Sequence, residues 1–89
     1  MRVLVVEDEP HLSVQLHDAL VEAGHVVELA TNGLDGWHLG AENDFDAVVL
    51  DLGLPRMDGL TVLRKWRADD RSMPVLILTA RDSWHEKVD

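Results

Sequence analysis

The chain has 89 residues and carries 17 acidic against 8 basic side chains, which gives a formal net charge of −9. This charge repels nucleic acid phosphates and anionic lipid surfaces, and the absence of cysteine excludes disulfides and thiolate metal sites. With 46% hydrophobic and 28% charged residues, the composition is that of a small globular domain, and we expect it in the cytoplasm. The first apolar run is too short for a signal peptide or a membrane span, so we expect no membrane association.

The first predicted element is a strand that is buried on both faces. Residues 3–6 form a continuous, Val-rich apolar run that ends at Glu7 and Asp8, which is the pattern of a strand inside a parallel sheet. A helix follows, because Pro10 suits a first helical turn and Gly24 suits a helix end. Its apolar stripe at helical spacing consists of Leu12, Leu16, Ala19, Leu20 and Ala23.

The next two predicted elements are a half-exposed strand and a helix that is weakened by glycine. Residues 26–30 alternate apolar side chains with Glu28, which predicts an edge strand, and turn-forming residues end it. Residues 34–42 can form a helix, in which Gly36 and Gly40 each cost about 1 kcal/mol relative to alanine. We therefore expect this helix to depend on tertiary packing. Its apolar face would consist of Leu34, Trp37, Leu39 and Ala41.

Residues 47–50 repeat the pattern of the first strand. They form a second fully apolar run that ends in an acid, Asp51, and they predict a second buried strand. Asp58 then suits the N-cap of a third helix, whose basic residues would face water. The apolar residues of this helix are Leu60, Val62, Leu63 and Trp66.

Residues 75–78, which Pro74 introduces, predict a third buried strand that ends at Thr79. Ser83 and Glu86 match a capping box, so a further helix is expected to begin there. Alternating strands and helices of this length predict one α/β domain, with a doubly wound parallel sheet covered by helices on both faces. Ligands bind such sheets beyond the carboxyl ends of the strands.

Acidic side chains follow two of the predicted buried strands. Glu7 and Asp8 end one strand and Asp51 ends the other, and parallel neighbours bring their carboxyl ends to one edge of the sheet. Ionised carboxylates about 5 Å apart repel by about 3 kcal/mol at an effective dielectric constant of about 20. Mg²⁺, which takes oxygen ligands, would offset this repulsion. The alternative is that these acids are solvated loop residues or helix N-caps.

Four segments together carry a family pattern. They read Val-Leu-Val-Val-Glu-Asp-Glu at 3–9, Asp-Leu-Gly-Leu-Pro at 51–55, Met-Asp-Gly at 57–59 and Leu-Ile-Leu-Thr-Ala-Arg at 76–81. In this order and spacing the chain closely resembles the receiver domain of bacterial two-component response regulators. It is most similar to the OmpR/PhoB branch, whose full-length members carry a winged-helix DNA-binding domain, and within that branch to PhoP-type regulators. The resemblance implies the CheY-like form of the flavodoxin-like fold.

The resemblance also implies a role for each site residue. Asp51 would accept a phosphoryl group from a histidine of a partner sensor kinase, as a phosphoacceptor that promotes its own phosphorylation rather than as a turnover enzyme. Asp8 and Asp51 would bind Mg²⁺ directly, and Glu7 would bind it directly or through water. The main-chain carbonyl of Gly53 would be a further metal ligand, and the Thr79 hydroxyl would hold the transferred group.

The family pattern extends beyond this chain. Its sheet has the order 2-1-3-4-5, and the fifth strand, with its phosphoryl-contacting lysine, and the last helix have no counterpart in these 89 residues. We therefore expect residues 1–89 to form a receiver domain that is incomplete at its C-terminus, with the strand order 2-1-3-4. DNA would be bound only through a C-terminal domain absent here. The strand at 74–78 would become an edge, so we expect homo-oligomers formed by edge pairing or by exchanged elements.

Two other functions remain open at the level of sequence. One is an interaction module that keeps the fold but self-associates without productive phosphotransfer. The other is a Mg²⁺-dependent phosphohydrolase of the haloacid dehalogenase kind. That class carries a second acid two residues after its nucleophile, where this chain has Gly53, so the phosphohydrolase is the weaker alternative.

Overall fold

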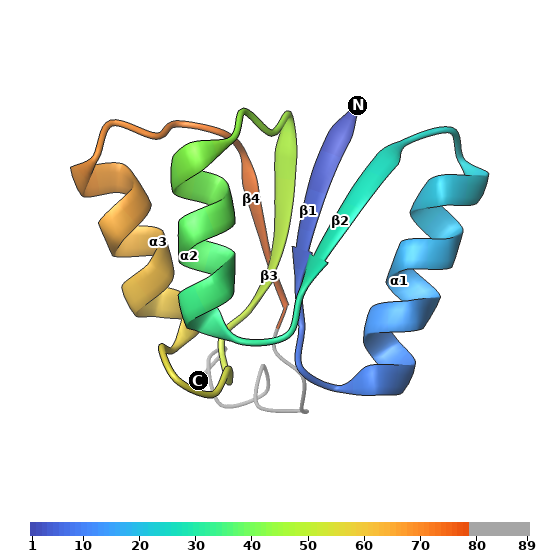
Figure 1. The fold of residues 1–89 in the computed structure, drawn as a ribbon, viewed down its shortest axis with the longest axis horizontal. Helices are drawn as coiled ribbons and strands as arrows, with labels where there is room; N and C mark the ends of the chain where they lie inside the picture. The colour runs from blue at the N-terminus through green and yellow to red at the C-terminus, as the bar shows by residue number, and fades with distance from the viewer. Residues whose placement is uncertain (79–89) are drawn as a thin grey trace, which may run out of the picture.

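The computed structural model describes residues 1–78. Within this part of the chain four parallel strands form one sheet in the order β2-β1-β3-β4. The strands are β1 (Arg2–Val6), β2 (Val26–Ala30), β3 (Ala47–Asp51) and β4 (Val75–Leu78). The helices are α1 (Pro10–Glu22), α2 (Gly33–Glu42) and α3 (Gly59–Ala68). α1 lies on one side of the sheet, and α2 and α3 lie on the other (Figure 1). The predicted fold class and the strand order 2-1-3-4 are confirmed.

β1 is one of the two inner strands of the sheet and pairs with β2 on one side and β3 on the other. Its residues Val3, Leu4, Val5 and Val6 are at most 2% exposed, so the prediction of a strand buried on both faces is confirmed. Leu4 and Val6 belong to the core under α2 and α3, and the alternation of side chains along a strand turns Val3 and Val5 towards α1. Each such side chain contributes roughly 1.5–3 kcal/mol through burial.

α2 packs against the rest of the fold through its glycines. The buried residues of this helix are Gly33, Gly36 and Gly40. A β-carbon at position 36 would lie 2.7 Å from a methyl group of Val6, and one at position 40 would lie 2.5 Å from the indole of Trp66. The expected apolar face of the helix is only half-buried. The helix therefore depends on tertiary packing, as its sequence indicated, but the closest contacts are made by the residues that weaken it.

β4 differs from its prediction as a third buried strand. Leu76 is 63% exposed and Ile77 is 37% exposed. The physical reason is that, among residues 1–78, β4 pairs only with β3, and α1 packs mainly on β1 and β2. The helix expected from Ser83 lies outside the described residues. None of the helices within residues 1–78 has the length and apolarity needed to cross a membrane.

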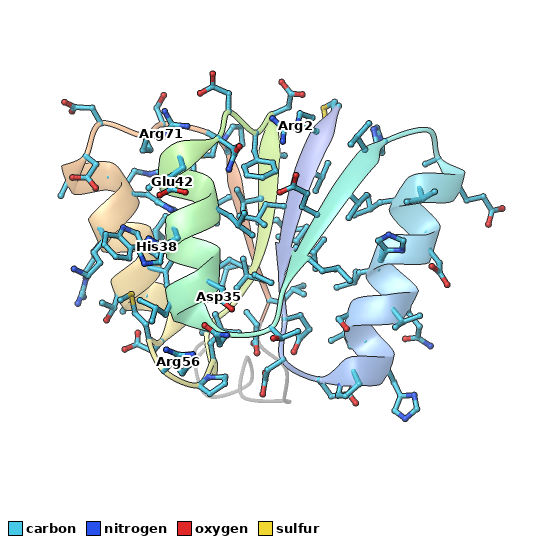
Figure 2. All side chains as sticks on the ribbon, viewed as in Figure 1. Arg2, Asp35, His38, Glu42, Arg56 and Arg71 are labelled. Atoms are coloured by element: carbon cyan, nitrogen blue, oxygen red, sulfur yellow. The ribbon has the colours of Figure 1, made fainter. Side chains whose placement is uncertain are left out.

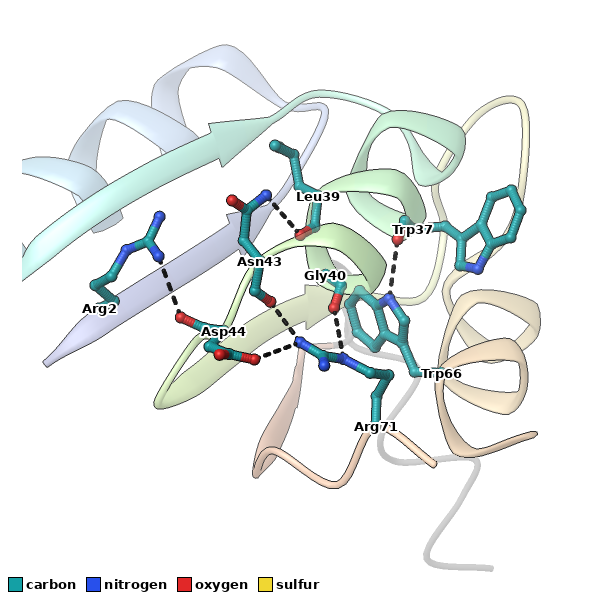
Figure 3. Close-up of polar contacts among 8 residues, drawn as sticks. All are labelled: Arg2, Trp37, Leu39, Gly40, Asn43, Asp44, Trp66 and Arg71. Carbon is teal, nitrogen blue, oxygen red and sulfur yellow. Dashed lines mark hydrogen bonds and ion pairs between the residues drawn. The ribbon is translucent and has the colours of Figure 1, made fainter. Parts of the chain in front are cut away.

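Two arginines clamp the loops at the amino-terminal edge of the sheet (Figure 3). The guanidinium of Arg71 donates to the carbonyl oxygens of Gly40 and Asn43, at 3.1 and 2.6 Å, and to a carboxylate oxygen of Asp44 at 3.0 Å. Arg2 donates to the carbonyl oxygen of Asp44 at 3.3 Å. The positive charge of Arg71 at the C-terminus of α2 also interacts favourably with the helix dipole. The clamp joins the end of α2 to the segment before β4.

Trp66 and Trp37 offer a matched test of the interface between α2 and α3. Trp66 is fully buried, and its indole N–H donates to the carbonyl oxygen of Trp37 at 3.1 Å. The indole N–H of Trp37 is buried without a hydrogen-bond partner among residues 1–78.

We expect Trp66→Phe to lower the free energy of unfolding by about 2 kcal/mol, because it removes a hydrogen bond and packed volume. Trp37→Phe should lower it by less than about 1 kcal/mol, because no hydrogen bond is lost. Urea denaturation followed by far-ultraviolet circular dichroism measures both values. Equal losses in the two variants would contradict this account of the interface.

Candidate metal and phosphoryl site

Three carboxylates meet at the carboxyl-terminal edge of the sheet. β1 and β3 are neighbours with Val6 opposite Leu50, so Glu7 and Asp51 leave adjacent strands at the same level. Carboxylate oxygens of Glu7, Asp8 and Asp51 all lie within 4.8 Å of one another. The predicted convergence of these three side chains is confirmed.

The cluster combines burial with unpaired oxygen atoms. Glu7 is 0% exposed and Asp51 is 1% exposed, whereas Asp8 is exposed. Glu7 Oε1 and Asp51 Oδ1 are buried without a hydrogen-bond partner among residues 1–78. The other oxygen of Glu7 accepts a hydrogen bond from the Glu9 N–H at 2.9 Å. Buried carboxylate oxygens without partners are costly, and a cation would satisfy them.

The electrostatics of Glu7 point in the same direction. Burial raises the pKa of the Glu7 carboxyl above its ordinary value; the Glu9 N–H opposes this shift, and the negative charges of Asp51 and Asp8 add to it. The ion pairs found within residues 1–78 all lie elsewhere: Arg2 with Glu28, His17 with Asp18, and Arg71 with Asp44. Figure 2 shows Arg2 and Arg71 at the opposite end of the sheet. Within residues 1–78, therefore, no ion pair neutralises the charge of the three carboxylates.

The alternative that these acids are helix N-caps does not hold. The N-cap of α1 is Glu9, whose carboxylate accepts hydrogen bonds from the backbone N–H groups of His11 and Leu12, at 3.2 and 2.7 Å. The N-cap of α3 is Asp58, as predicted, and it accepts from the Thr61 N–H at 3.0 Å. Other acids therefore cap these helices, and the burial of Glu7 and Asp51 sets these two apart from solvated loop residues.

The donor set fits a hard divalent cation. All three side chains offer carboxylate oxygen, which Mg²⁺ prefers, and ligands of an octahedral Mg²⁺ lie at most about 4.2 Å apart. The observed limit of 4.8 Å is slightly wider, so small side-chain shifts would bring the oxygens into contact with one ion. Asp8, the exposed member, leaves the cluster open to solvent on one side.

The loop that follows β3 carries the remaining predicted ligand. Gly53 is exposed, two residues after Asp51. At the end of the loop, the Gly59 N–H donates to the carbonyl oxygen of Leu52 at 3.0 Å, and a β-carbon at position 59 would lie 2.1 Å from the carbonyl oxygen of Asp51. Gly59 thus allows α3 to begin directly against the end of β3. Thr79 lies outside the described residues, and Leu78, which precedes it, is paired with Asp51.

One close contact of this loop has no signal in the sequence. Gly33 donates its N–H to the carbonyl oxygen of Pro55 at 3.1 Å. The sequence marks residues 31–33 only as a turn, because a contact between segments more than 20 residues apart leaves no trace in local periodicity.

Comparison with known proteins decides the family. The family model of the response regulator receiver domain matches residues 3–89. The chain belongs to this family. It is 46% identical over its whole length to the transcriptional regulatory protein PhoP of Escherichia coli K12, and equally to the virulence transcriptional regulatory protein PhoP of Salmonella typhimurium LT2. It spans about 40% of the length of these curated relatives.

Solved receiver structures share the fold. The Francisella response regulator 1452 receiver domain superposes with a TM-score of 0.88 at 30% identity, over 98% of this chain and 72% of that one. The Thermotoga maritima response regulator TrrA, solved in complex with Mg²⁺ and BeF, gives 0.86 at 30% identity, over 98% and 76%. The receiver domain of the Pseudomonas aeruginosa sensor histidine kinase PA1611, with a magnesium ion in its active-site cleft, gives 0.87 at 28% identity, over 99% and 74%.

The raised pKa of Glu7 predicts a pH-dependent loss of stability in metal-free protein. Because folded Glu7 holds its proton more tightly than the unfolded chain does, its stabilising contribution is present below about pH 4.5 and is lost as the pH rises through the raised folded pKa. In EDTA, Glu7→Gln should therefore melt at a higher temperature than the parent at pH 7, and this advantage should shrink towards pH 4. Thermal melts between pH 4 and pH 8 measure it.

The control for this experiment is Glu42→Gln, which removes an exposed carboxylate outside the cluster. If the melting temperature of Glu7→Gln equals that of the parent across the whole pH range, the result would contradict the destabilising burial of the Glu7 carboxylate beside Asp51 and Asp8.

Proposed function

We propose that this receiver domain accepts a phosphoryl group on Asp51 from a histidine of a sensor kinase, in the presence of Mg²⁺, as part of a two-component transcriptional response regulator. The observation that carries the proposal is the buried carboxylate of Asp51, one of whose oxygens lies within 4.8 Å of carboxylate oxygens of Glu7 and Asp8, and whose Oδ1 has no hydrogen-bond partner among residues 1–78. The PhoP relatives, named as transcriptional regulatory proteins, support the wider role. TrrA, solved with Mg²⁺ and BeF, supports the chemistry.

Each residue has a definable part in this transfer. Carboxylate oxygens of Glu7, Asp8 and Asp51, with the carbonyl oxygen of Gly53, would hold the ion, and Mg²⁺ bound there would offset charge on the transferring group. A carboxylate oxygen of Asp51 forms a bond to phosphorus while the bond from phosphorus to the histidine nitrogen breaks, and the histidine keeps that electron pair. The product is an acyl phosphate on Asp51. The Thr79 hydroxyl would donate a hydrogen bond to the transferred group.

The fold restricts where the nucleophile can move. Asp51 is the last residue of β3 and pairs with Leu78, and the Leu52 N–H donates to the carbonyl oxygen of Leu78 at 3.2 Å. Because little covalent chemistry is asked of the protein, phosphoryl transfer depends mainly on positioning and charge compensation. A nucleophile at the end of a paired strand suits that demand.

The partners follow from the same proposal. A sensor histidine kinase supplies the phosphoryl group, and the reaction takes place in the cytoplasm. DNA contact belongs to a further domain of the longer protein, because a net charge of −9 repels nucleic acid. The domain acts as a phosphoacceptor rather than as a turnover enzyme.

The central test is phosphorylation by a small-molecule donor. With acetyl phosphate and Mg²⁺, the parent should gain one phosphoryl group by intact-mass spectrometry, and Asp51→Asn should gain none. Asp18→Asn, which removes an exposed aspartate on α1, should gain the group as the parent does. An adduct of undiminished yield in Asp51→Asn, or none in the parent, would sink the proposal.

A second candidate function is self-association, favoured by the exposure of β4. Leu76 is 63% exposed, and the outer edge of β4 has no strand partner within residues 1–78. A hollow of about 350 Å³, which Leu76 helps to line, is formed mainly by apolar side chains from β1, β3 and β4, together with Leu20 of α1. Apolar edges of this kind invite pairing with another chain.

Light scattering at micromolar concentration tests this candidate on the 89-residue chain. We expect a mass above that of the monomer, and Leu76→Lys should shift the mass towards the monomer, because a charge on the strand opposes edge pairing. Val14→Lys places the same charge on a 53% exposed apolar residue of α1 and should leave the mass unchanged. A monomeric mass for the parent would rule out self-association.

A further inference from the structure

We propose that Gly33, the first residue of α2, is a positioning residue for the metal site. It acts through the loop of residues 52–58, which follows the phosphoacceptor strand and carries Gly53. The inference rests on the proposed function in one respect, since it takes the carbonyl oxygen of Gly53 as a metal ligand.

Gly33 touches the loop in two ways. Its N–H donates to the carbonyl oxygen of Pro55 at 3.1 Å. A β-carbon at position 33 would lie 1.6 Å from the carbonyl oxygen of Met57 and 2.6 Å from its carbonyl carbon. Both of these atoms belong to the backbone, so no side-chain rotation can relieve the overlap. Any larger residue at position 33 must displace either the loop or the start of α2.

The requirement for glycine here is one of space. Among residues 1–78, the glycine with a positive φ is Gly24. Other residues could therefore adopt the backbone φ of Gly33. The α2 N-terminus instead needs Gly33 because a hydrogen atom is the largest group that fits against the loop.

Gly33 contacts the loop at a strained turn. The Met57 N–H donates to the carbonyl oxygen of Pro55 at 2.8 Å, and Arg56 between them has a φ of 70°. A hydrogen bond from residue i+2 to residue i around a positive φ defines the rare, strained form of the γ-turn. Such a conformation persists only where the surrounding structure holds it. The Pro55 carbonyl accepts from both Met57 and Gly33, so Gly33 helps to hold this turn.

The loop is thus held on both sides of Gly53. On the strand side, Gly59 packs against Asp51 and donates its N–H to Leu52. On the helix side, Gly33 contacts Pro55 and Met57. A shift of the helix-side contact would move the segment from which the Gly53 carbonyl must reach the ion.

The same helix provides matched controls. Gly36 contacts Val6 and Gly40 contacts Trp66, and a β-carbon at either position would meet those side chains at 2.5 to 2.7 Å. The three heavy atoms nearest to such a β-carbon belong to Val6 at position 36 and to Trp66 at position 40, and none belongs to residues 52–58. Gly36→Ala and Gly40→Ala therefore disturb the packing of α2 without a direct contact with the loop.

The experiment compares Mg²⁺ affinity, measured by calorimetry, in Gly33→Ala, Gly36→Ala and Gly40→Ala at a temperature where each is folded. All three should melt at lower temperatures than the parent. Only Gly33→Ala should bind Mg²⁺ more weakly, by about ten- to hundredfold, as is typical for groups that orient metal ligands. Parental Mg²⁺ affinity in folded Gly33→Ala, or an equal loss in all three variants, would overturn the inference.

If Gly33→Ala does not fold, two milder substitutions at the ends of α2 test the same inference. Asn32→Ala loosens the start of α2, because the Asn32 side chain accepts from the Asp35 N–H at 2.8 Å. Asn43→Ala loosens its other end, where the Asn43 side chain donates to the carbonyl oxygen of Leu39 at 3.1 Å. Asn32→Ala should weaken Mg²⁺ binding and Asn43→Ala should not, and the reverse result would overturn the inference.

Hydrogen exchange in EDTA separates this inference from the proposed function. If the parent binds no Mg²⁺, the proposed function fails, but the contact between α2 and the loop can still be measured. The Met57 amide should exchange faster in Gly33→Ala than in the parent, and at the parental rate in Gly36→Ala. Unchanged exchange of Met57 in Gly33→Ala would overturn the positioning role whatever the metal does.

Discussion

The rest of the structure depends on the parallel pairing of β1 with β3. With Val6 opposite Leu50, this pairing sends Glu7 and Asp51 from neighbouring strands to one edge of the sheet. Carboxylates about 5 Å apart repel by about 3 kcal/mol at an effective dielectric constant of about 20, and burial removes the water that would screen them. The packing that stabilises the sheet therefore creates an electrostatic cost at its edge. A divalent cation shared by the three carboxylates would offset that cost.

The ion pairs within residues 1–78 do not involve the three site carboxylates. The arginine clamp of Arg2 and Arg71 lies at the amino-terminal edge, where it binds carbonyl oxygens at the end of α2 and a carboxylate of Asp44. Both cations lie at the opposite end of the sheet from its carboxyl-terminal edge (Figure 2). Acids at the amino-terminal end of the sheet are thus paired with arginines, whereas Glu7, Asp8 and Asp51 have no ion-pair partner among residues 1–78.

α2 shows how a local weakness becomes a tertiary contact. Glycine costs a helix about 1 kcal/mol relative to alanine, yet Gly36 and Gly40 let the helix backbone approach Val6 and Trp66 more closely than any other residue would. Gly33 extends the same close approach to the loop after β3. Close packing at its glycines, rather than an apolar stripe, therefore holds this helix in place. Because Gly33 contacts the loop after β3, the position of the helix also affects the position of that loop.

Local pattern by itself determined most of the fold and the identity of the three carboxylates. The apolar runs that end at Glu7 and Asp51 marked two buried strands, and Asp58 marked the start of α3, because strand burial and helix capping leave signals within a few residues. Periodicity did not show that β4 is exposed, since burial at a sheet edge depends on what lies beside it. Nor did it show the contact of Gly33 with Pro55. Only the tertiary structure decided these, because they arise between segments that are distant in the chain and close in space.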